Sequence, residues 1–252
     1  MKPPIYKPKG AALEYGDFAI NIYDTCNHGC YYCYAKSMYE RFHGKGSFCK
    51  TPEPRPGIIE AVKNQLDKEQ ITGKMIHLCF ACDPYPADID TTATREIIKL
   101  LKAAGNHVQI LTKGGRKSTD DFDLLGRNDR YGVTFSGYAG SDIIYHPAEP
   151  NASRPKERMG NIMWARMLGI QTWVSFEPVL DAESVLRELE YIHVDTEVKI
   201  GKLNYHQSNI NWHNFGHAAE EICKRRGLNY YIKDSLRKDM EADGHGEIAG
   251  NA

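Results

Sequence analysis

The stretch DTCNHGCYYCYAK (residues 24–36) contains three cysteines within eight residues, Cys26, Cys30 and Cys33. Cysteines that merely pack in a core need no cysteine neighbours, so three soft ligands this close together indicate a metal site. Their spacing is C-x3-C-x2-C, and they directly follow an apolar run that begins at Phe18. The sequence therefore predicts a strand followed by a loop that carries three metal-binding thiolates.

Two kinds of metal site are compatible with this loop. A zinc site needs a fourth ligand from Cys or His, and His28 within the loop and His43 beyond it are candidates. A [4Fe-4S] cluster can be held by three thiolates with its fourth iron left open, which is useful only if a further molecule binds there. Tyr32, just before the last cysteine, would supply an aromatic wall beside such a molecule.

The composition is that of a globular protein. Of the 252 residues, 41% are hydrophobic and 26% are charged. The formal net charge of -1 excludes a general attraction to nucleic acid, so such a partner would need a local basic patch. No apolar run approaches the roughly 18 residues of a membrane span, and the N-terminal residues lack the apolar core of a signal peptide. We expect a cytoplasmic protein with no membrane partner, in which the seven cysteines are free thiols or metal ligands.

Apolar runs rich in β-branched residues alternate with helical patterns along the chain. The expected strands lie at residues 18–24, 75–82, 107–113, 131–137, 171–179 and 197–203. The expected helices lie at residues 94–105, 154–169, 182–192 and 213–227. This repetition predicts parallel strands joined by right-handed crossovers, in an open partial barrel or a doubly wound sheet.

The residues at the strand ends favour the barrel. At or just after the ends of the six expected strands lie Cys26, Asp83, Lys113, Ser136, Glu177, and Lys202 or Asn204. In parallel βα folds these strand ends share one face, where active sites are built. Because every expected strand ends in such a residue, we predict that they form a ring around one site.

The cysteine motif in this setting resembles the radical S-adenosylmethionine (SAM) superfamily, and the resemblance extends over about residues 18–233. It implies an α/β fold, a partial (β/α)6 TIM-like barrel of parallel strands with outer helices. We expect this barrel over residues 18–240, preceded by an extended segment (1–17) and followed by a flexible tail (241–252).

The same resemblance implies the cofactors. The three cysteines would hold a [4Fe-4S] cluster, and the amino and carboxylate groups of SAM would bind its open iron. The reduced cluster would cleave SAM to methionine and a 5′-deoxyadenosyl radical, which takes a hydrogen atom from the substrate. An electron donor of the flavodoxin or ferredoxin type would supply the electron.

Five further stretches resemble the spore photoproduct lyase-like branch of that superfamily: CDPYP, LTKGG, TFSG, EPNASRPKER and VSFEP. By position, the resemblance implies contacts with SAM. The residues and their expected contacts are Tyr32 with adenine, Ser136 with ribose, Lys113 with ribose or carboxylate, Arg158 with the methionine carboxylate, and Cys82 or Asp83 with the amino group. Glu177 would be either a carboxylate that faces the cofactor or substrate, or a buried structural one. The other residues also have ordinary alternatives as solvated charges or turn formers.

A second C-x2-C pair, Cys79 and Cys82, lies in the second expected strand. Residues i and i+3 of a strand point to opposite faces, so we expect Cys79 in the core and Cys82 in the site. The lyase, by resemblance, returns a hydrogen atom to its product from a cysteine on this strand, although its donor would align with Phe80. Cys82 and Tyr205 are our catalytic candidates. Cys223 is expected in the core, and Cys49 has no companion motif.

The resemblance implies a thymine-derived base in DNA as the substrate, as a lesion or a modified base. We expect the base near Tyr85, Lys202, Asn204 and Tyr205. Phosphates would then meet a basic patch of Arg225, Arg226, Arg237 or Lys238, unless these residues only cap and solvate helices. Two alternatives remain open: a radical SAM enzyme that acts on a small molecule, RNA or peptide, and a non-catalytic zinc-binding βα domain. The oligomeric state is not predicted.

Overall fold

One twisted sheet of eight strands forms the centre of the protein. The structure is a computed structural model that describes residues 3–48, 50–137 and 148–242. The strands follow one another across the sheet in chain order. They are β1 (Ile5–Tyr6), β2 (Phe18–Ile20), β3 (Met75–Leu78), β4 (His107–Thr112), β5 (Arg130–Thr134), β6 (Gln171–Phe176), β7 (Glu197–Ile200) and β8 (Tyr230–Ile232). Strand β1 is antiparallel to β2, and every other neighbouring pair is parallel.

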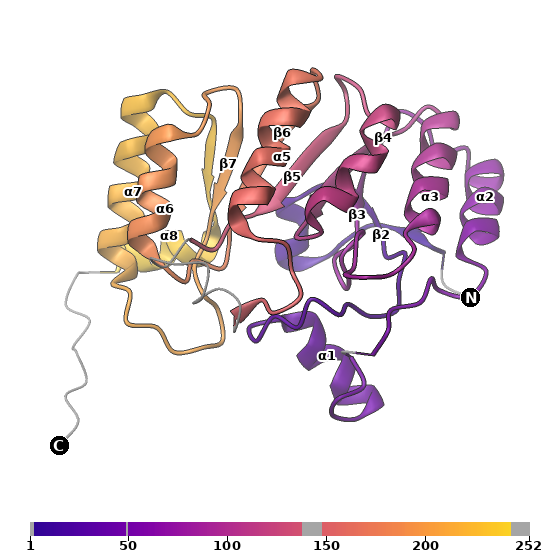
Figure 1. The fold of residues 1–252 in the computed structure, drawn as a ribbon, viewed down its shortest axis with the longest axis horizontal. Coiled ribbons are helices and arrows are strands. Elements are labelled where there is room, and N and C mark those ends of the chain that lie inside the picture. Colours follow the sequence, from indigo (N-terminus) through magenta and orange to yellow (C-terminus); the bar gives the residue numbers. More distant parts are fainter. Residues whose placement is uncertain (1–2, 49, 138–147, 243–252) are drawn as a thin grey trace.

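Helices cover the outer face of this sheet (Figure 1). They are α2 (Ile58–Glu69), α3 (Thr92–Ala103), α5 (Pro155–Met167), α6 (Ala182–Tyr191) and α7 (Trp212–Arg226), with the 3-10 helix η2 (Gly115–Leu124) between β4 and β5. Helix α8 (Asp234–Glu241) packs against α7. Helix α1 (Tyr34–His43) instead lies beyond the end of the sheet, apart from the outer layer (Figure 1).

The predicted α/β partial barrel is confirmed, with one parallel strand more than expected. The additional strand, β8, pairs with β7. Among the described residues no pairing joins β8 to β1, so the barrel is open. The first expected strand is much shorter than predicted, because it stops pairing at Ile20, six residues before the first cysteine.

The first residues of the chain are not a simple extended segment, contrary to our expectation. They contribute β1 and the 3-10 helix η1 (Gly10–Glu14). Gln65 on α2 fixes β1, because its side chain bonds both the N–H and the C=O of Ile5. At the other end, Glu241 completes α8, and residues 243–252 of the expected tail lie outside the described residues.

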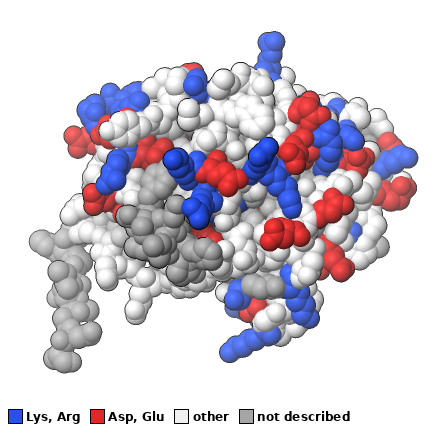
Figure 2. All heavy atoms as spheres, in the orientation of Figure 1, with Lys and Arg blue, Asp and Glu red and all other residues white. Residues whose placement is uncertain are grey.

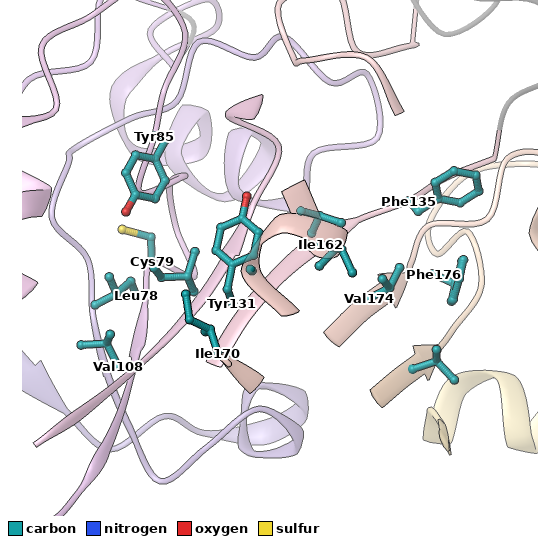
Figure 3. Close-up of a cluster of buried hydrophobic side chains, with 14 of the residues drawn as sticks. Leu78, Cys79, Tyr85, Val108, Tyr131, Phe135, Ile162, Ile170, Val174 and Phe176 are labelled. Carbon is teal, nitrogen blue, oxygen red and sulfur yellow. The ribbon is translucent and has the colours of Figure 1, made fainter. Parts of the chain in front are cut away.

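Two packed layers stabilise the barrel. Between the sheet and the helices lies an apolar core that includes Leu78, Val108, Val174 and Phe176 (Figure 3). The second layer contains aromatic and charged side chains: Tyr15, which follows η1, contacts the rings of His77, Phe80 and Trp173, and the ammonium of Lys199.

Gly132 on β5 permits this inner packing. A Cβ atom at this position would lie 2.2 Å from Nε1 of Trp173, whose indole N–H donates to the carbonyl of Ile110. The fully buried Trp173 cannot retreat easily. We expect Gly132→Ala to reduce the free energy of unfolding by about 1–3 kcal/mol through overpacking.

Gly160 provides the matched control, because it lies within α5 and a Cβ there would meet nothing within 4 Å. Gly160→Ala should increase stability by about 0.5–1 kcal/mol through helix propensity. Urea unfolding of both variants, followed by circular dichroism, measures the two changes. Equal effects of the two substitutions would contradict the packing described for Trp173.

Candidate functional site

The loop that carries the three cysteines is held by contacts at several points. The side chain of Asn27 bonds both the N–H and the C=O of Ala87, which lies beyond the end of β3. The carbonyl of His28 accepts a hydrogen bond of 3.0 Å from the N–H of Asn151. Gly29 has φ 74°, and a Cβ there would lie 2.8 Å from Pro150. The loop conformation thus depends on its neighbours as well as on its own sequence.

Cys26, Cys30 and Cys33 line one cavity together with His28 and Lys36. Burial, and then the charge of Asp83, raise the pKa of the Cys26 thiol well above its usual range. Burial also raises the pKa of Cys30 to about 11, although Lys113 acts in the opposite direction. These two thiols are therefore protonated at neutral pH in the metal-free chain, and a metal that binds them must displace the protons.

Asp83 joins the cysteine loop to two strand ends. Its carboxylate accepts hydrogen bonds from the hydroxyl of Thr112 at 2.5 Å and from the N–H of Lys113 at 2.9 Å, both at the end of β4. The Nδ1 atom of His28 lies 3.5 Å from the same carboxylate. Asp83 directly follows the expected strand at residues 75–82. Its carboxylate oxygens contact both the cysteine loop and the end of β4.

Glu149 is the functional residue that the sequence analysis missed. This carboxylate is 3% exposed, and it contacts the hydroxyls of Tyr32 and Ser136 and the guanidinium of Arg158. Burial alone would raise the pKa of Glu149, but Arg158 and Lys113 outweigh burial and lower the pKa to about 2. Three of the predicted SAM-binding residues therefore meet at one ionised carboxylate.

Arg158 is more deeply embedded than its predicted role requires. Its side chain is 1% exposed, and besides Glu149 it donates to the carbonyls of Thr134 and Ser153. The alternative of a solvated charge on a helix face is wrong. Its contact with the methionine carboxylate stays a prediction, as do the SAM contacts of Tyr32, Asp83, Ser136 and Glu177.

Lys113 lies between the cysteine loop and Glu149. Burial on its own would lower the pKa of this amine, but negative charge on Cys30 and on Glu149 outweighs burial and raises the pKa. Its ammonium lies 5.6 Å from the ring centre of Tyr32. A fixed cation beside an aromatic ring and the cysteine loop suits a ligand with a carboxylate and a planar base.

Glu177 belongs to the opposite side of the barrel. Its carboxylate accepts from the ammonium of Lys233, from Asn204 at 3.2 Å and from the hydroxyl of Tyr15 at 3.3 Å. Lys233 also contacts Glu14 at 3.2 Å. These contacts join the ends of β6 and β8 to the first residues of the chain, which gives Glu177 a structural role in the described residues.

The position of Cys79 and Cys82 corrects one prediction. Strand β3 ends at Leu78, so the alternation of a strand does not apply, and Cys79 adopts φ 67°. The two thiols therefore lie close enough to hydrogen-bond, and burial and this contact raise the pKa of Cys79. Cys79 is buried, as expected, and Cys82 is half-buried, while its place in the site stays a prediction. Cys223 is fully buried on α7, and Cys49 lies outside the described residues.

The rim of the site is formed by the cysteine loop and by the segment between β7 and α7. The ring of Tyr31 meets that of His206 edge-on at 5.2 Å. The neighbouring Tyr205 is 94% exposed and has φ 64°. Tyr85, expected near the substrate, is instead fully buried and donates to Asp121. The ammonium of Lys202 forms an ion pair of 2.5 Å with Asp239.

Two of the four residues predicted for the basic patch lie at the end of the barrel away from the site. Helix α7 starts near the carboxyl end of β7 and runs back, so Arg225 and Arg226 lie at the end of the barrel opposite the cysteines. Arg225 pairs with Glu190, and Arg226 donates to the carbonyls of Leu189 in α6 and of Ile192 just after it. Arg237 and Lys238 lie on α8, which starts at the cysteine end.

Comparison with known proteins identifies the chemistry of this site. The family model of the radical SAM superfamily matches residues 20–192, which include all three cysteines and every strand from β3 to β6. The chain belongs to the radical SAM superfamily. It is therefore a radical SAM enzyme, and the alternative of a non-catalytic zinc-binding domain is wrong.

Relatives of this radical SAM enzyme occur in a virus and in an archaeon. An uncharacterised protein of Acidianus two-tailed virus is 27% identical over an alignment of 224 positions, which covers 77% of this chain and 73% of the viral protein. An uncharacterised protein of Methanocaldococcus jannaschii is 27% identical over 201 residues, which are 78% of this chain and 71% of the archaeal protein.

Solved structures share the fold. Spore photoproduct lyase complexed with a dinucleoside spore photoproduct superposes with a TM-score of 0.66 at 12% identity, over 92% of this chain and 79% of the lyase. SuiB of Streptococcus suis bound to its precursor peptide has a TM-score of 0.63 at 9% identity, over 88% of this chain and 50% of SuiB.

The residues of this radical SAM enzyme fit the cofactors that the family implies. In the described part of the chain, no three His, Cys, Asp or Glu side chains converge on a single metal ion. A four-iron cubane makes a different demand, because each cysteine binds a separate iron around a larger volume. The three thiols line one cavity together with His28, whose Nε2 is buried and has no hydrogen-bond partner among the described residues, and three thiolates are the donor set that such a cubane needs.

Each cluster cysteine should be indispensable for iron. We expect Cys26→Ala, Cys30→Ala and Cys33→Ala to lose the brown colour of the anaerobically reconstituted enzyme and about four irons per chain. Cys223→Ala is the matched control, because its buried thiol lies on α7 away from the loop. Cys49→Ala should also keep its iron. Iron and sulfide analysis measures the cluster content of each variant. Full iron content in Cys30→Ala would disprove the assignment of these cysteines as cluster ligands.

Lys113 and Arg158 should respond differently to truncation. Lys113→Ala should keep the cluster and weaken SAM binding by about 1.5–3 kcal/mol, the range for a hydrogen bond to a charged group, as measured by calorimetry. Arg158→Ala should lower the free energy of unfolding by about 3–5 kcal/mol, since it leaves Glu149 charged and buried. Glu149→Gln combined with Arg158→Gln removes both charges and should restore part of that loss. Unchanged SAM affinity in Lys113→Ala would show that this lysine does not face the cofactor.

Proposed function

We propose that this radical SAM enzyme abstracts a hydrogen atom from a thymine-derived base in a polynucleotide, to repair a lesion or remodel a modified base. The observation that carries the proposal is the open rim beside the cysteine loop, where Tyr31 and Tyr205 are about half and almost fully exposed. The fold is shared with a lyase whose structure contains a dinucleoside. Exposed aromatic rings beside a reactive centre suit a flat base that is held by stacking.

Different residues beside the cysteine loop would bind different parts of the cofactors. When bound, the cluster and SAM supply a 5′-deoxyadenosyl radical that takes a hydrogen atom from the substrate. Lys113 offers a fixed positive charge to a carboxylate, and Asp83 keeps the backbone of Lys113 in place. Glu149 keeps the hydroxyls of Tyr32 and Ser136 oriented on the same side. None of these groups must reorganise when charge develops, which is what preorganised sites require.

The substrate base has to leave its stack to reach this site. Inside a duplex, the methyl group and ring of thymine are separated from a radical that is held within a barrel. Extruding a base costs a few kcal/mol, and a damaged or modified base costs less than a normal one. The preference for abnormal bases therefore follows in part from the geometry of access.

Cys82 is the hydrogen-atom donor in this proposal. It is half-buried, as a group between the core and the site must be, and it packs against the apolar core. Donation from the Cys82 thiol to a product radical leaves a thiyl radical. An electron from the flavodoxin or ferredoxin type of donor, together with a proton, restores the thiol.

The substrate class is tested with the reconstituted enzyme, SAM and dithionite in deuterated water. Oligonucleotides that carry normal, dimerised or 5-substituted thymines are compared with a peptide, since SuiB shares the fold and binds one. We expect 5′-deoxyadenosine to form in step with a change in one modified oligonucleotide. Formation that only a peptide or small molecule stimulates would overturn the polynucleotide substrate and leave the radical SAM chemistry intact.

Cys82→Ala should separate the formation of 5′-deoxyadenosine from the formation of the deuterated product. Thiol hydrogens exchange with deuterated water, so the product of the unmodified enzyme should carry deuterium from Cys82. In Cys82→Ala, 5′-deoxyadenosine should continue to form, while the amount of deuterated product falls at least tenfold. Cys79→Ala is the control, because this neighbouring thiol is buried at 6% exposure. A normal deuterated product from Cys82→Ala would remove Cys82 from the mechanism.

A further inference from the structure

One face of helix α1 is mostly uncovered by the rest of the chain, and only its first residue, Tyr34, contacts the body among the described residues, through a hydrogen bond from its hydroxyl to the carbonyl of Phe80. Tyr34, Met38 and Phe42 are four residues apart along this helix and therefore lie on the same side of it. They are 51%, 59% and 81% exposed, respectively. Arg41, seven residues after Tyr34, falls on the same side and is also exposed. A helix of a globular protein normally turns such apolar positions inward, so the exposure of this face indicates an interaction surface.

The opposite face of α1 is well anchored. The ring of Tyr39 stacks on His43 at 4.1 Å and meets Phe48 edge-on at 5.7 Å. Phe48 is 3% exposed and lines the cysteine cavity together with Lys36. We call residues 34–48 the α1 arm. Phe48 and Lys36 therefore join the arm to the cysteine cavity.

The charge of the arm is positive and is not neutralised within the chain. Its charged residues are Lys36, Arg41, Lys45 and a single acid, Glu40. Among the described residues neither Arg41 nor Lys45 forms an ion pair, and Glu40 accepts a hydrogen bond from the N–H of Gly46. Lys50, just beyond the arm, is likewise exposed, and it forms no ion pair with another residue that the structure describes. Figure 2 shows Lys and Arg side chains gathered on the arm, where it extends below the body of the protein.

The arm also starts at the reactive centre. Cys33, one of the cluster cysteines, is the residue at the N-terminal cap of α1. Eight residues of helix separate Tyr34 from Phe42, a rise of about 12 Å. In one strand of B-form DNA, successive phosphates are about 3.4 Å apart along the axis, so this face spans three to four nucleotides. Its length matches the strand on one side of an extruded base.

We propose that the α1 arm binds the polynucleotide strand next to the reacting base, with Arg41 and Lys45 on phosphates and Met38 and Phe42 against a neighbouring base. This proposal rests on the polynucleotide substrate proposed above and names the surface that binds it. Unpaired cations supply the charge complementarity to phosphate, and the apolar positions between them supply a surface for stacking. The arm replaces Arg225 and Arg226, which lie at the wrong end of the barrel.

The binding test uses the full chain, reconstituted anaerobically, and fluorescence anisotropy with a labelled single-stranded oligothymidine. Arg41→Ala with Lys45→Ala should weaken binding and lower the slope of log affinity against log salt by about 1.4, or about 0.7 for each lost phosphate contact. Phe42→Ala should weaken binding about tenfold and leave the salt slope unchanged, because stacking releases no counterions.

Matched controls separate the arm from general effects of charge and exposure. Lys63→Ala with Lys68→Ala removes two exposed lysines from α2, which are also without an ion pair among the described residues. Tyr191→Ala removes a ring that is 79% exposed at the end of α6. Both controls should bind as the unmodified enzyme does. An RNA of the same sequence is run beside the DNA, and tighter binding of either one identifies the source of the strand.

The outcomes distinguish this proposal from the proposed function. Loss of affinity in the arm variants and not in the controls supports the arm. Unchanged affinity in both arm variants, with normal binding by the unmodified enzyme, overturns the arm and leaves the polynucleotide substrate standing. An unmodified enzyme that binds no oligonucleotide at low salt, yet forms 5′-deoxyadenosine with a peptide, overturns both. Iron content and SAM affinity of every variant should stay unchanged, since the substituted side chains do not face the thiols.

Discussion

The carboxylate of Asp83 is the contact on which the site depends. It holds the hydroxyl and backbone at the end of β4, and it faces His28 of the cysteine loop. Three segments that are far apart in the chain are thereby held in register around one buried charge. Such a charge is stable only when its lone pairs are satisfied, so the loop, the strand end and the carboxylate stabilise one another. This junction therefore positions the cysteine loop against the end of β4.

A second buried charge, that of Glu149, organises the side of the cavity where SAM is expected. Its partners come from the cysteine loop, from the end of β5 and from α5. An ion pair as deeply buried as Glu149 and Arg158 adds little net stability compared with an apolar pair, and its benefit is specificity of arrangement. Here that arrangement sets the hydroxyls of Tyr32 and Ser136 against one carboxylate beside the cysteine loop. The cost of burying these charges is therefore consistent with a binding site and is difficult to explain for a simple core.

Much of the fold could be predicted from the sequence, because βα units produce alternating strand and helix patterns of apolar residues. The expected helix at residues 154–169 agrees with α5 within two residues at each end. The strand ends were less accurate where a polar site begins, since the run of apolar residues continues past the last paired one. Cys79 shows the reason: it continues the apolar run, but its positive φ has already turned the chain out of the sheet.

The site was predictable where one residue acts with its neighbours in the chain, and not where distant segments meet. The cysteine motif is local, so its ligands could be named from spacing. Glu149 could not, because its partners Tyr32, Ser136 and Arg158 converge only after three segments have packed. Arg225 and Arg226 were misplaced although a signal existed. Helices in βα units run antiparallel to the strands, which puts a basic helix end at the face away from the site.

The contacts of Lys233 also determine when the barrel can finish folding. This lysine joins Tyr15 and Glu14, more than 210 residues earlier, to the last parallel strand. Contacts between residues so far apart in sequence form late, because the loop between them must close first. During synthesis the first residues of the chain must wait for the last strand to leave the ribosome. Until then, the inner aromatic layer stays uncovered, and a nascent chain exposes the surface on which Tyr15 later packs.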